Sequence, residues 1–222
     1  MKSCILSIEK EVSGYYVKGG IYMCGRYTFS ETVPCEELEK IIASVQRSKP
    51  AFLQKSAEIN PGDTAPIYFY KEKKIHLSLM PWGFRNPWKK GVIINARAET
   101  AASKQIFSPS LHSRRCVIPS AGFYEWNREK QKYLYTLSGP PLYMGGLYTF
   151  YEDGPRFLIL TVPANSSVSP VHPRMPLLLP KEQIRPWLCD LPKALELLGT
   201  PQPELRTIQM EEEPAQLCLS SV

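Results

Sequence analysis

The first clear pattern along the chain is helical. Apolar side chains recur at the spacing i, i+3, i+4 and i+7 within residues 38–45, behind the helix-start residues Thr32 and Pro34. The four apolar positions are Leu38, Ile41, Ile42 and Val45. Because this spacing places them on one face of a helix, it predicts an amphipathic helix. Shorter helices are expected at 99–104, 181–189 and 191–198, and Pro186 limits the helix at 181–189.

Most of the remaining apolar residues fall in short runs separated by turn residues. The segments 64–70 and 73–80 flank the polar pair Lys71-Glu72, which is typical of a β-hairpin. Many short strands, few helices and no regular alternation of strand and helix predict a single compact α+β domain. Its core is expected to be a curved, mostly antiparallel sheet or barrel with a few peripheral helices. Further strands are expected at 25–29, 92–95, 115–118, 123–126, 132–137, 142–150 and 156–162.

Composition narrows the class of protein. A chain of 222 residues with 43% hydrophobic and 22% charged residues is typical of one globular domain. No apolar segment approaches the length of a membrane span, so we expect a cytoplasmic monomer without a membrane partner. The six cysteines form no CxxC pair, and the three histidines do not cluster with them. The sequence therefore predicts no metal site, no disulfide framework and no cofactor.

Charge divides the chain into three parts. Residues 1–22 contain only a short apolar run before charges intervene, which is too little for a signal peptide, and we expect an upstream extension. Residues 201–222 hold one basic side chain against four acidic ones, which predicts an acidic C-terminal tail. The body between them, residues 23–200, holds 23 basic and 15 acidic side chains, a net charge of +8. A body of this charge can attract phosphates.

The segment Met23-Cys24-Gly25-Arg26-Tyr27 reads like the beginning of a protein, although 22 residues precede it. The codons of Lys18-Gly19-Gly20 can spell a purine-rich ribosome-binding site, which favours Met23 as the start. Removal of Met23 would leave an α-amine and a thiol on adjacent carbons of Cys24. With reference pKa values of ~7.8 and ~8.5, both groups are partly nucleophilic near neutral pH. Such an aminothiol condenses with an aldehyde and closes a thiazolidine ring, whereas an internal cysteine lacks the amine.

Three further polar residues stand where chemistry is plausible. Asn95 follows an apolar run and precedes Ala96-Arg97-Ala98-Glu99. Glu125 lies between two aromatic residues, whose packing would raise the pKa of the carboxyl group, as a general acid or base requires. His172 stands between two prolines in a stiff loop. Each has a structural alternative, since Asn95 can cap a helix, Glu125 can pair with an arginine and His172 can be a loop residue.

Five segments follow one another in a definite order. They are Met23-Cys24-Gly25-Arg26-Tyr27, Pro81-Trp82-Gly83, Asn95-Ala96-Arg97-Ala98-Glu99-Thr100, Arg115-Cys116-Val117-Ile118-Pro119 leading into Gly122-Phe123-Tyr124-Glu125-Trp126, and His172-Pro173-Arg174-Met175-Pro176. Together they resemble the ordered motifs of the SOS-response-associated peptidase (SRAP) family, the abasic-site processing proteins. Any one segment alone is weak evidence for the family, but five segments in one order make the resemblance specific. The resemblance runs from Met23 to about Leu188.

The resemblance implies a covalent reaction with abasic DNA, whose ring-opened sugar carries an aldehyde. It makes Cys24 the nucleophile, through its amine and its sulfur, after autoproteolytic removal of the residues before it. Glu125 would then move protons during ring closure and reversal, and His172 would protonate the sugar oxygen to open the ring. Asn95 would bind the opened sugar or orient Cys24. The partner expected by resemblance is single-stranded DNA with abasic sites, bound at the nucleoid after damage.

DNA contacts are expected from arginines and tryptophans close to these residues. Guanidinium groups can hold the phosphates that flank the lesion, and indole rings can stack on unstacked bases. For both tryptophans, packing in the core is the alternative. Weaker candidates are Lys89, Lys90, Lys104, Arg114 and Arg115. The expected DNA-binding residues are Arg26, Trp82, Arg97, Trp126 and Arg174.

Two other functions fit the same residues. A cysteine peptidase acting on other proteins would use Cys24 with His172 and either Asn95 or Glu125, and it needs only a thiolate, so it tolerates an extended N-terminus. A non-catalytic DNA-binding module would show salt-sensitive binding that survives the substitution Cys24→Ala.

Overall fold

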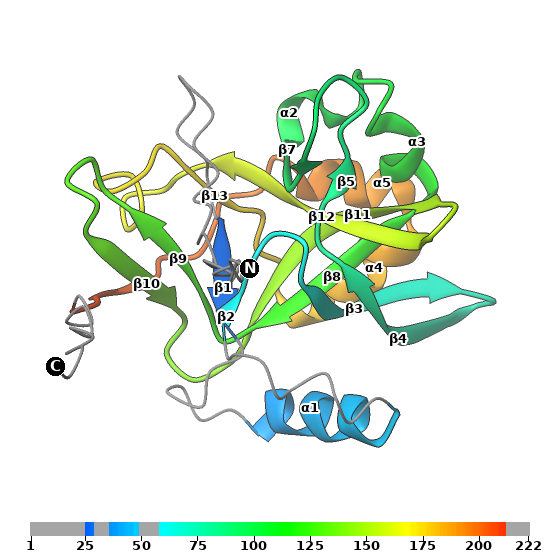
Figure 1. Ribbon diagram of the computed structural model, residues 1–222. Helices are drawn as coiled ribbons and strands as arrows, with labels where there is room; N and C mark the ends of the chain where they lie inside the picture. The colour runs from blue at the N-terminus through cyan, green and yellow to red at the C-terminus, as the bar shows by residue number, and fades with distance from the viewer. Residues whose placement is uncertain (1–24, 29–35, 49–57, 212–222) are drawn as a thin grey trace, which may run out of the picture.

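The computed structural model describes residues 25–28, 36–48 and 58–211 (Figure 1). Within these ranges, two curled sheets meet where β8 runs directly into β9. The five-stranded sheet has the order β14 (Arg206–Gln209), β10 (Lys132–Thr136), β9 (Gly122–Trp126), β1 (Arg26–Thr28), β2 (Glu58–Ile59). The seven-stranded sheet has the order β13 (Arg174–Pro176), β12 (Gly154–Pro163), β11 (Leu142–Tyr151), β8 (Arg115–Ser120), β3 (Thr64–Lys71), β4 (Lys74–Pro81), with β7 (Asn95–Arg97) on β12.

All named strand pairs of the two sheets are antiparallel except β7 on β12, in the part of the chain that the structure describes. The predicted α+β domain with a curved, mostly antiparallel sheet is therefore confirmed. Two short strands, β5 (Phe84–Arg85) and β6 (Val92–Ile93), form a separate hairpin.

A glycine permits the corner between β8 and β9. A Cβ atom on Gly122 would lie 2.7 Å from the carbonyl oxygen of Tyr135 and 2.7 Å from Leu134 Cδ1, so a larger residue would push β10 away. The Ser120 hydroxyl donates to the Gly122 carbonyl at 2.7 Å, with the Thr28 carbonyl 3.0 Å away. This corner thereby fixes β1 and β9 in one sheet.

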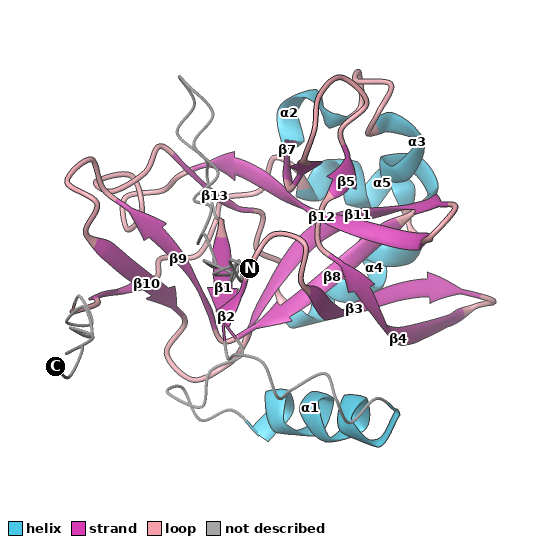
Figure 2. Cartoon of the chain, in the orientation of Figure 1, coloured by secondary structure: helices cyan, strands magenta, loops and turns pink. Residues whose placement is uncertain are grey.

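The predicted helix at 38–45 is confirmed as α1 (Glu36–Ser48), which buries Leu38, Ile41 and Val45. The remaining helices lie outside the sheets (Figure 2), and α1 stands apart from them. None of the helices in the described ranges is long and apolar enough to cross a membrane. The others are α2 (Ala98–Ala101), α3 (Ser108–Ser113), the 3₁₀ helix η2 (Lys181–Gln183), α4 (Ile184–Cys189) and α5 (Leu191–Leu197).

The predicted hairpin at 64–80 is confirmed as β3 and β4. Its turn residues Glu72 and Lys73 have φ values of 51° and 61°, which is the left-handed geometry of a tight hairpin turn. The turn lies one residue after the predicted pair Lys71-Glu72. Other elements also differ from the sequence prediction. The strand expected at 92–95 is divided between β6 and β7, residues 174–176 of the expected stiff loop form β13, and α3, β2 and β5 have no predicted counterpart.

The segment expected to be an acidic tail contributes to the sheet. Residues 206–209 form β14 and pair with β10 in the register Leu134↔Ile208 and Tyr135↔Thr207. Leu205, just before this strand, is buried. The local sequence is short and rich in charge, so only the exposed edge of β10 explains why it becomes a strand. Residues 201–211 therefore belong to the domain.

Candidate functional site

The five-stranded sheet has two chemically different faces. β1 and β9 pair in the register Arg26↔Tyr124 and Tyr27↔Phe123. Because alternate residues of a strand point to opposite faces, Arg26, Tyr124 and Trp126 share one face, while Tyr27, Phe123 and Glu125 share the other. Tyr27 and Phe123 are fully buried, so theirs is the inner face. Glu125 and Trp126 are adjacent in the sequence but lie on opposite sides of the sheet.

Glu125 is held on the inner face among aromatic rings. Only 1% of its surface is exposed. Two residues before it, Phe123 stacks on Tyr135 with ring centroids 5.1 Å apart. Burial raises the pKa of Tyr135 above its ordinary value, and the negative charge of Glu125 raises it further. The aromatic surroundings expected for Glu125 therefore exist, but on its own face they come from Phe123 and Tyr135 rather than from its sequence neighbours.

Trp82 joins this inner face to the strand that begins with Asn95. Its ring meets Tyr27 edge-on at 5.2 Å, and its indole Nε1 donates to the Ile94 carbonyl at 2.9 Å. The side chain is 0% exposed. The prediction that Trp82 stacks on DNA bases is therefore corrected: it is a core residue, and its polar atom is already bonded to backbone.

The second group of predicted residues flanks β12. Asn95 pairs in register with Ile159 and Arg97 pairs with Thr161 on the parallel side. On the other side of β12, Arg174 pairs with Pro163. The buried Thr161 hydroxyl donates to the Ala96 carbonyl at 3.3 Å. Both predicted arginines, Arg97 and Arg174, thus lie beside the carboxyl-terminal half of β12.

Arg174 is already engaged by a carboxylate. Its guanidinium forms a two-pronged ion pair with Glu99, in which Nη2 lies 2.7 Å from Oε2, and it also donates to the Thr161 carbonyl at 2.6 Å. The hydrogen bond from Arg174 is the largest cause that lowers the pKa of Glu99. Only 15% of the Arg174 side chain is exposed. A DNA phosphate at this position would meet an ion pair rather than an isolated cation.

His172 is buried two residues before Arg174. Its exposed fraction is 4%, and this burial lowers the pKa of the imidazole below its ordinary value. His172 Nδ1 lies 3.1 Å from the backbone nitrogen of Arg174 and 3.2 Å from its carbonyl oxygen, so the Arg174 backbone holds this edge of the ring. The His172 backbone N–H donates to the Val168 carbonyl at 3.0 Å, which holds the loop at this residue. Burial favours the neutral form of the imidazole.

Asn165, which the sequence pattern does not single out, organises the loop that carries His172. Its Nδ2 donates to the Pro203 carbonyl at 2.7 Å, and its Oδ1 accepts from the Ser167 hydroxyl at 2.7 Å. The Leu205 backbone N–H donates to Ser167 Oγ at 3.1 Å. Residues 202–209 therefore connect the His172 loop to β10, and through β10 to the strand of Glu125. A side-chain amide between two loops leaves no periodic signal in a sequence.

Arg26 and Trp126 do lie together, on the outer face. The Arg26 guanidinium is 5.4 Å from the centroid of the Trp126 ring, a cation–π arrangement. About 43% of the Arg26 side chain is exposed, and Trp126 is half-buried. Both are accessible to a ligand on this face, as the prediction of DNA contacts requires.

One exposed aromatic residue escapes the sequence prediction. Trp88, in the turn between β5 and β6, is 75% exposed and is followed by the exposed Lys89 and Lys90. The Trp88 backbone N–H donates to Asn86 Oδ1 at 3.0 Å, which shapes the turn. An indole ring beside two lysines is the combination found in proteins that bind single-stranded nucleic acid, and this pattern is visible in the sequence.

Arg115, a weaker candidate for DNA contact, has a structural role instead. It is 5% exposed, and its guanidinium donates to the carbonyls of Trp187 at 2.6 Å and Leu111 at 2.7 Å. The predicted nucleophile Cys24 lies outside the described residues, next to Gly25, where the description begins. Among the described residues, no group of three or more His, Cys, Asp or Glu side chains is placed to hold a metal.

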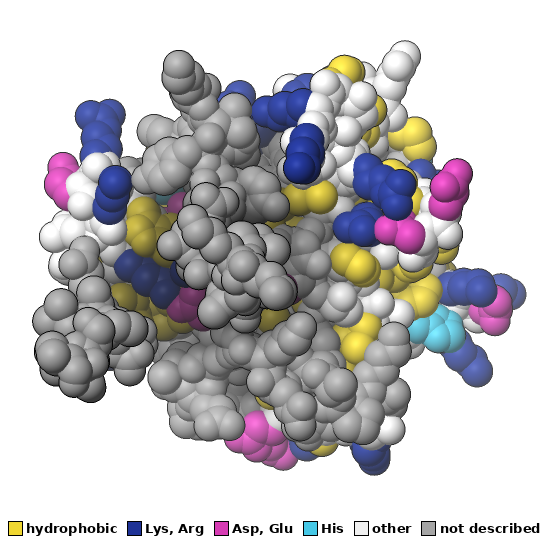
Figure 3. All heavy atoms as spheres, viewed as in Figure 1, with side chains coloured by type: hydrophobic (Ala, Val, Ile, Leu, Met, Phe, Trp, Pro, Cys, Tyr) yellow, Lys and Arg dark blue, Asp and Glu magenta, His cyan; other side chains and the backbone are white. Residues whose placement is uncertain are grey.

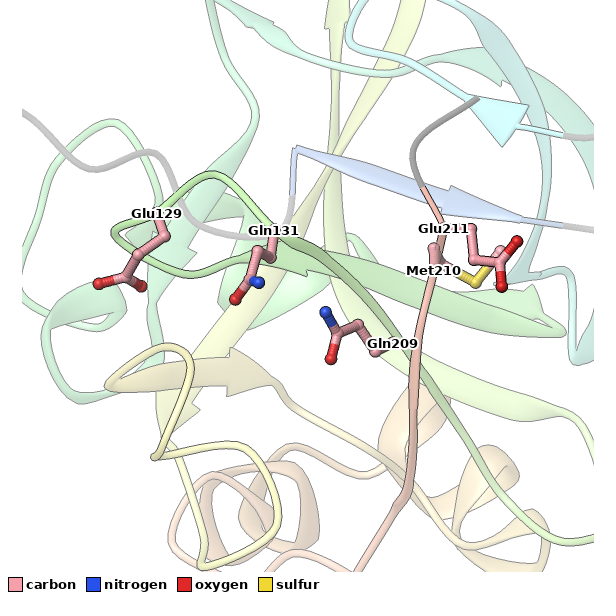
Figure 4. A pocket seen from close by; sticks show the side chains of 5 residues that line it. All are labelled: Glu129, Gln131, Gln209, Met210 and Glu211. Atoms are coloured by element: carbon pink, nitrogen blue, oxygen red, sulfur yellow. The ribbon is translucent and has the colours of Figure 1, made fainter. Parts of the chain in front are cut away.

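A hollow of about 640 Å³ opens between the turn after β9 and the end of β14 (Figure 4). Two of its five lining side chains are carboxylates, which repel phosphate groups. None of the predicted site residues in the described ranges lines it. Its lining residues are Glu129, Gln131, Gln209, Met210 and Glu211.

Comparisons with known proteins agree with these motifs. The family model described as SOS response associated peptidase (SRAP) matches residues 23–213. The abasic site processing protein YedK of Escherichia coli is 31% identical over 177 residues, which cover 75% of this chain and 79% of YedK. YoqW of Bacillus subtilis, with the same description, is 31% identical over 182 residues, covering 75% and 80%. HMCES of Xenopus tropicalis, also called an abasic site processing protein, is 29% identical over 149 residues, covering 50% and 44%.

Solved structures show the same fold. A crystal structure of a Bacteroides thetaiotaomicron protein superposes with a TM-score of 0.68 at 20% identity, covering 85% of this chain and 92% of the other. A phage-related protein from Bordetella bronchiseptica superposes with a TM-score of 0.65 at 24% identity, covering 86% and 95%. The fold of this chain is thus shared with these solved structures.

Proposed function

Since the chain belongs to the SOS response associated peptidase (SRAP) family, we propose that it processes abasic sites in single-stranded DNA by forming a covalent bond through Cys24. The relatives named above are called abasic site processing proteins, which supports the substrate. The family model also begins at residue 23, the predicted start. Release of Cys24 as an N-terminus would require loss of the initiator methionine from a chain that starts at Met23, and autoproteolytic removal of residues 1–23 from a chain that starts at Met1.

The observation that carries this proposal is a series of pairwise contacts that links the five motif segments to one another. β1 of the first segment pairs with β9 of the fourth, and Tyr27 of the first packs on Trp82 of the second. Trp82 bonds to the backbone immediately before the third. Glu99 of the third pairs with Arg174 of the fifth. Segments up to 150 residues apart in the sequence therefore build one region of the molecule, as a shared active site requires.

The proposed reaction conserves atoms and needs no redox partner. The Cys24 amine attacks the C1′ aldehyde of the opened sugar, and loss of one water gives an imine. The Cys24 sulfur then adds to the imine carbon, its proton passes to nitrogen, and the thiazolidine ring closes. Glu125 takes and returns protons during these steps, which suits a carboxylate shielded from water at 1% exposure.

In this proposal His172 and Asn95 act on the deoxyribose of the abasic site. The imidazolium form of His172 gives a proton to the ring oxygen while the C1′ hydroxyl loses its proton to water, which opens the deoxyribose and exposes the aldehyde. Asn95 hydrogen-bonds the opened sugar or orients the Cys24 terminus. The burial of His172 and its bond to the Arg174 backbone keep the ring in one orientation. That fixed geometry supports a role in proton transfer.

The DNA is proposed to lie across Arg26, Trp126, Arg97 and the Trp88 turn, which are accessible. Arg174 contributes through its ion pair with Glu99, so it is proposed to position the strand rather than to supply a free charge. Trp82 is left out of this set because it is buried.

The test is the intact mass of the protein after mixing with a single-stranded oligonucleotide that carries one abasic site. Chains that begin at Met23 should lose the methionine and gain the oligonucleotide mass less one water. Cys24→Ala should gain nothing, whereas Cys24→Ser should form at most an imine that acid or heat reverses. A stable adduct on Cys24→Ala would refute the assignment of the nucleophile.

The same experiment separates the two alternatives. A peptidase that needs only a thiolate would act on other proteins and would stay active when the α-amine of Cys24 is acetylated. A binding module would retain the oligonucleotide without a covalent mass increase. Chains that begin at Met1 test the autoproteolytic step, because they form the adduct only after losing residues 1–23.

A further inference from the structure

A cluster of charges and aromatic rings covers the outer face of the five-stranded sheet. Register places Arg26 opposite Tyr124, Trp126 opposite Lys132, and Thr28 opposite Glu58. Strand alternation puts all of these side chains on the face that carries Trp126. Figure 3 shows Lys or Arg and acidic side chains next to each other on this face, over β9 and β10, beside hydrophobic ones.

Glu58 is the anionic centre of this cluster. Its Oε2 lies 3.4 Å from Arg26 Nη1, and its Oε1 accepts a hydrogen bond from Lys132 Nζ. Burial raises the pKa of Tyr124, and both the charge of Glu58 and a hydrogen bond to it raise that pKa further. The carboxylate therefore meets two cations and one phenol.

Aromatic rings form the floor beneath the two cations. Lys132 Nζ lies 4.0 Å from the Tyr124 ring centroid and 5.9 Å from that of Trp126, and Arg26 lies 5.4 Å from the Trp126 ring. Lys132 therefore extends across Tyr124 to reach Glu58. The rings hold the cations in place whether or not a carboxylate is present, because cation–π attraction does not depend on it.

The two cations of the cluster reach solvent, whereas Tyr124 beneath them is buried. The exposed fractions are 43% for the Arg26 side chain, 25% for Lys132 and 26% for Glu58, against 5% for Tyr124. Water competes with Glu58 most easily for Arg26, where the two charged atoms lie 3.4 Å apart. A second anion that also gains stacking on Trp126 can therefore displace Glu58.

We propose that Arg26 and Lys132, the latter above the Tyr124 ring, form a phosphate-binding site for single-stranded DNA, and that Glu58 occupies this site in the free protein as an intramolecular competitor. The proposal rests on the proposed function, in which DNA crosses this face. A phosphodiester accepts hydrogen bonds from the same donors as a carboxylate, and the base next to it stacks on Trp126. Glu58 leaves when the strand arrives.

Competition and support predict opposite changes in DNA affinity when Glu58 is replaced. If Glu58 merely held Arg26 and Lys132 in place, Glu58→Gln would weaken DNA binding. If Glu58 competes with phosphate, the same substitution strengthens binding, because two cations no longer have an internal partner. We expect the Kd to fall about two- to fivefold at 0.1 M salt, the range set by one partly exposed ion pair.

Salt dependence provides a second readout. Cations that are neutralised by Glu58 in the free protein exchange one anion for another on binding, so the net release of counterions is small. In Glu58→Gln the same cations neutralise DNA phosphate without such an exchange. The slope of log Kd against log salt should then be steeper by about 0.7 for each freed cation.

The experiment measures the Kd of a single-stranded oligonucleotide that carries a stable, non-reactive abasic analogue, from 0.05 to about 0.3 M salt. The variants are Glu58→Gln, Lys132→Gln, the double variant, and Glu37→Gln. Glu37→Gln is the matched control. Glu37, on α1, forms an ion pair with Lys181 at 2.8 Å, so its substitution also removes one negative charge from an ion pair, but at a place outside the proposed phosphate site. Thermal melting checks that each variant folds.

The inference expects tighter binding and a steeper slope for Glu58→Gln than for Glu37→Gln. It also expects Lys132→Gln to cost more affinity in the Glu58→Gln background than in the wild type, because only in that background does Lys132 give up no ion pair when DNA binds. Binding that is weaker or equal to that of Glu37→Gln overturns it. Should Glu58→Gln not fold, an unchanged Kd for Lys132→Gln overturns it instead.

Failure of the proposed function has a different signature. A wild-type protein that gains no mass with reactive abasic DNA, yet binds the analogue more tightly after Glu58→Gln, supports the phosphate site and refutes the covalent reaction. A wild-type protein that gains the adduct mass but shows no effect of Glu58→Gln refutes only the inference.

Discussion

Burial sets the chemistry of the proposed acid and base at the level of single side chains. Glu125 and His172 are 1% and 4% exposed. Glu125 lies on the sheet face that carries the stacked rings of Phe123 and Tyr135, and His172 contacts the backbone of Arg174. A buried imidazole resists protonation, since the charged form loses its hydration. The protonation of His172 is therefore coupled to the stability of the fold.

Protonation of His172 should destabilise the folded state as the pH falls. The pKa of His172 is lowered in the folded state, so the unfolded chain binds more protons as pH falls below ~6.5. Stability from this residue is present above that pH and is lost progressively toward the lower folded pKa. We expect the melting temperature of wild type to fall between pH 7.5 and pH 5.5 by more than that of His172→Gln.

The matching control is His112→Gln, which removes an exposed imidazole on α3. If His112→Gln reduces the pH dependence of the melting temperature as strongly as His172→Gln does, the coupling does not come from the buried ring.

At the level of elements, residues 202–209 connect the two halves of the proposed active site. They bond to the His172 loop through Asn165 and Ser167, and they pair as β14 with β10, which in turn pairs with the strand of Glu125. The same short segment therefore connects the two residues proposed to transfer protons, His172 and Glu125. A loop held by side-chain bonds has little stability of its own.

Asn165→Ala tests this connection. It removes the bond to Pro203 and leaves the Pro203 carbonyl without that donor, so we expect about 1–3 kcal/mol of destabilisation. We also expect slower crosslinking to abasic DNA with an unchanged Kd for the non-reactive analogue, because Asn165 supports the loop that carries His172 and is not among the proposed DNA contacts. Single-turnover rates and binding titrations measure the two effects separately.

Asn60→Ala is a suitable comparison for Asn165→Ala, because Asn60 bonds only locally to Asp63 at 3.4 Å through its amide. Equal loss of crosslinking rate in both variants would mean that the Asn165 bonds to Pro203 have no special role for His172.

For the molecule as a whole, Trp82 lies where the two sheets face each other. It contacts Tyr27 of the five-stranded sheet, stacks on Phe157 of β12 at 6.3 Å and bonds to the backbone before β7. Loss of this ring would open a cavity between the elements that carry Glu125 and Asn95. The two tryptophans predicted to bind DNA therefore have separate roles, one in stability and one at the surface.

Trp82→Ala should lower the stability of the fold, whereas Trp126→Ala should lower the affinity for DNA. We expect Trp82→Ala to cost about 3–5 kcal/mol of unfolding free energy, as for other buried aromatic residues. Trp126→Ala should cost little stability but should weaken the Kd for single-stranded DNA by about five- to 100-fold, the range for one stacked base. Chemical denaturation and DNA titration measure the two quantities, and a reversed pattern would contradict both placements.

Local sequence determined the parts of this protein that depend on local chemistry. The spacing of Leu38, Ile41 and Val45 predicted α1, and the turn at Lys71-Glu72 predicted the β3–β4 hairpin, because periodicity and turn geometry act over a few residues. The order of five motifs was enough to indicate the SRAP family, which the family match to residues 23–213 bears out.

Only the tertiary structure decided which side chains meet and which are buried. It placed Glu125 and Trp126 on opposite faces, turned Trp82 into a core residue, paired Arg174 with Glu99 and added β14 to the sheet. These outcomes depend on contacts between residues far apart in the sequence, such as the 75 positions between Glu99 and Arg174. Burial and charge pairing are properties of the folded surface, and no local pattern in the chain contains them.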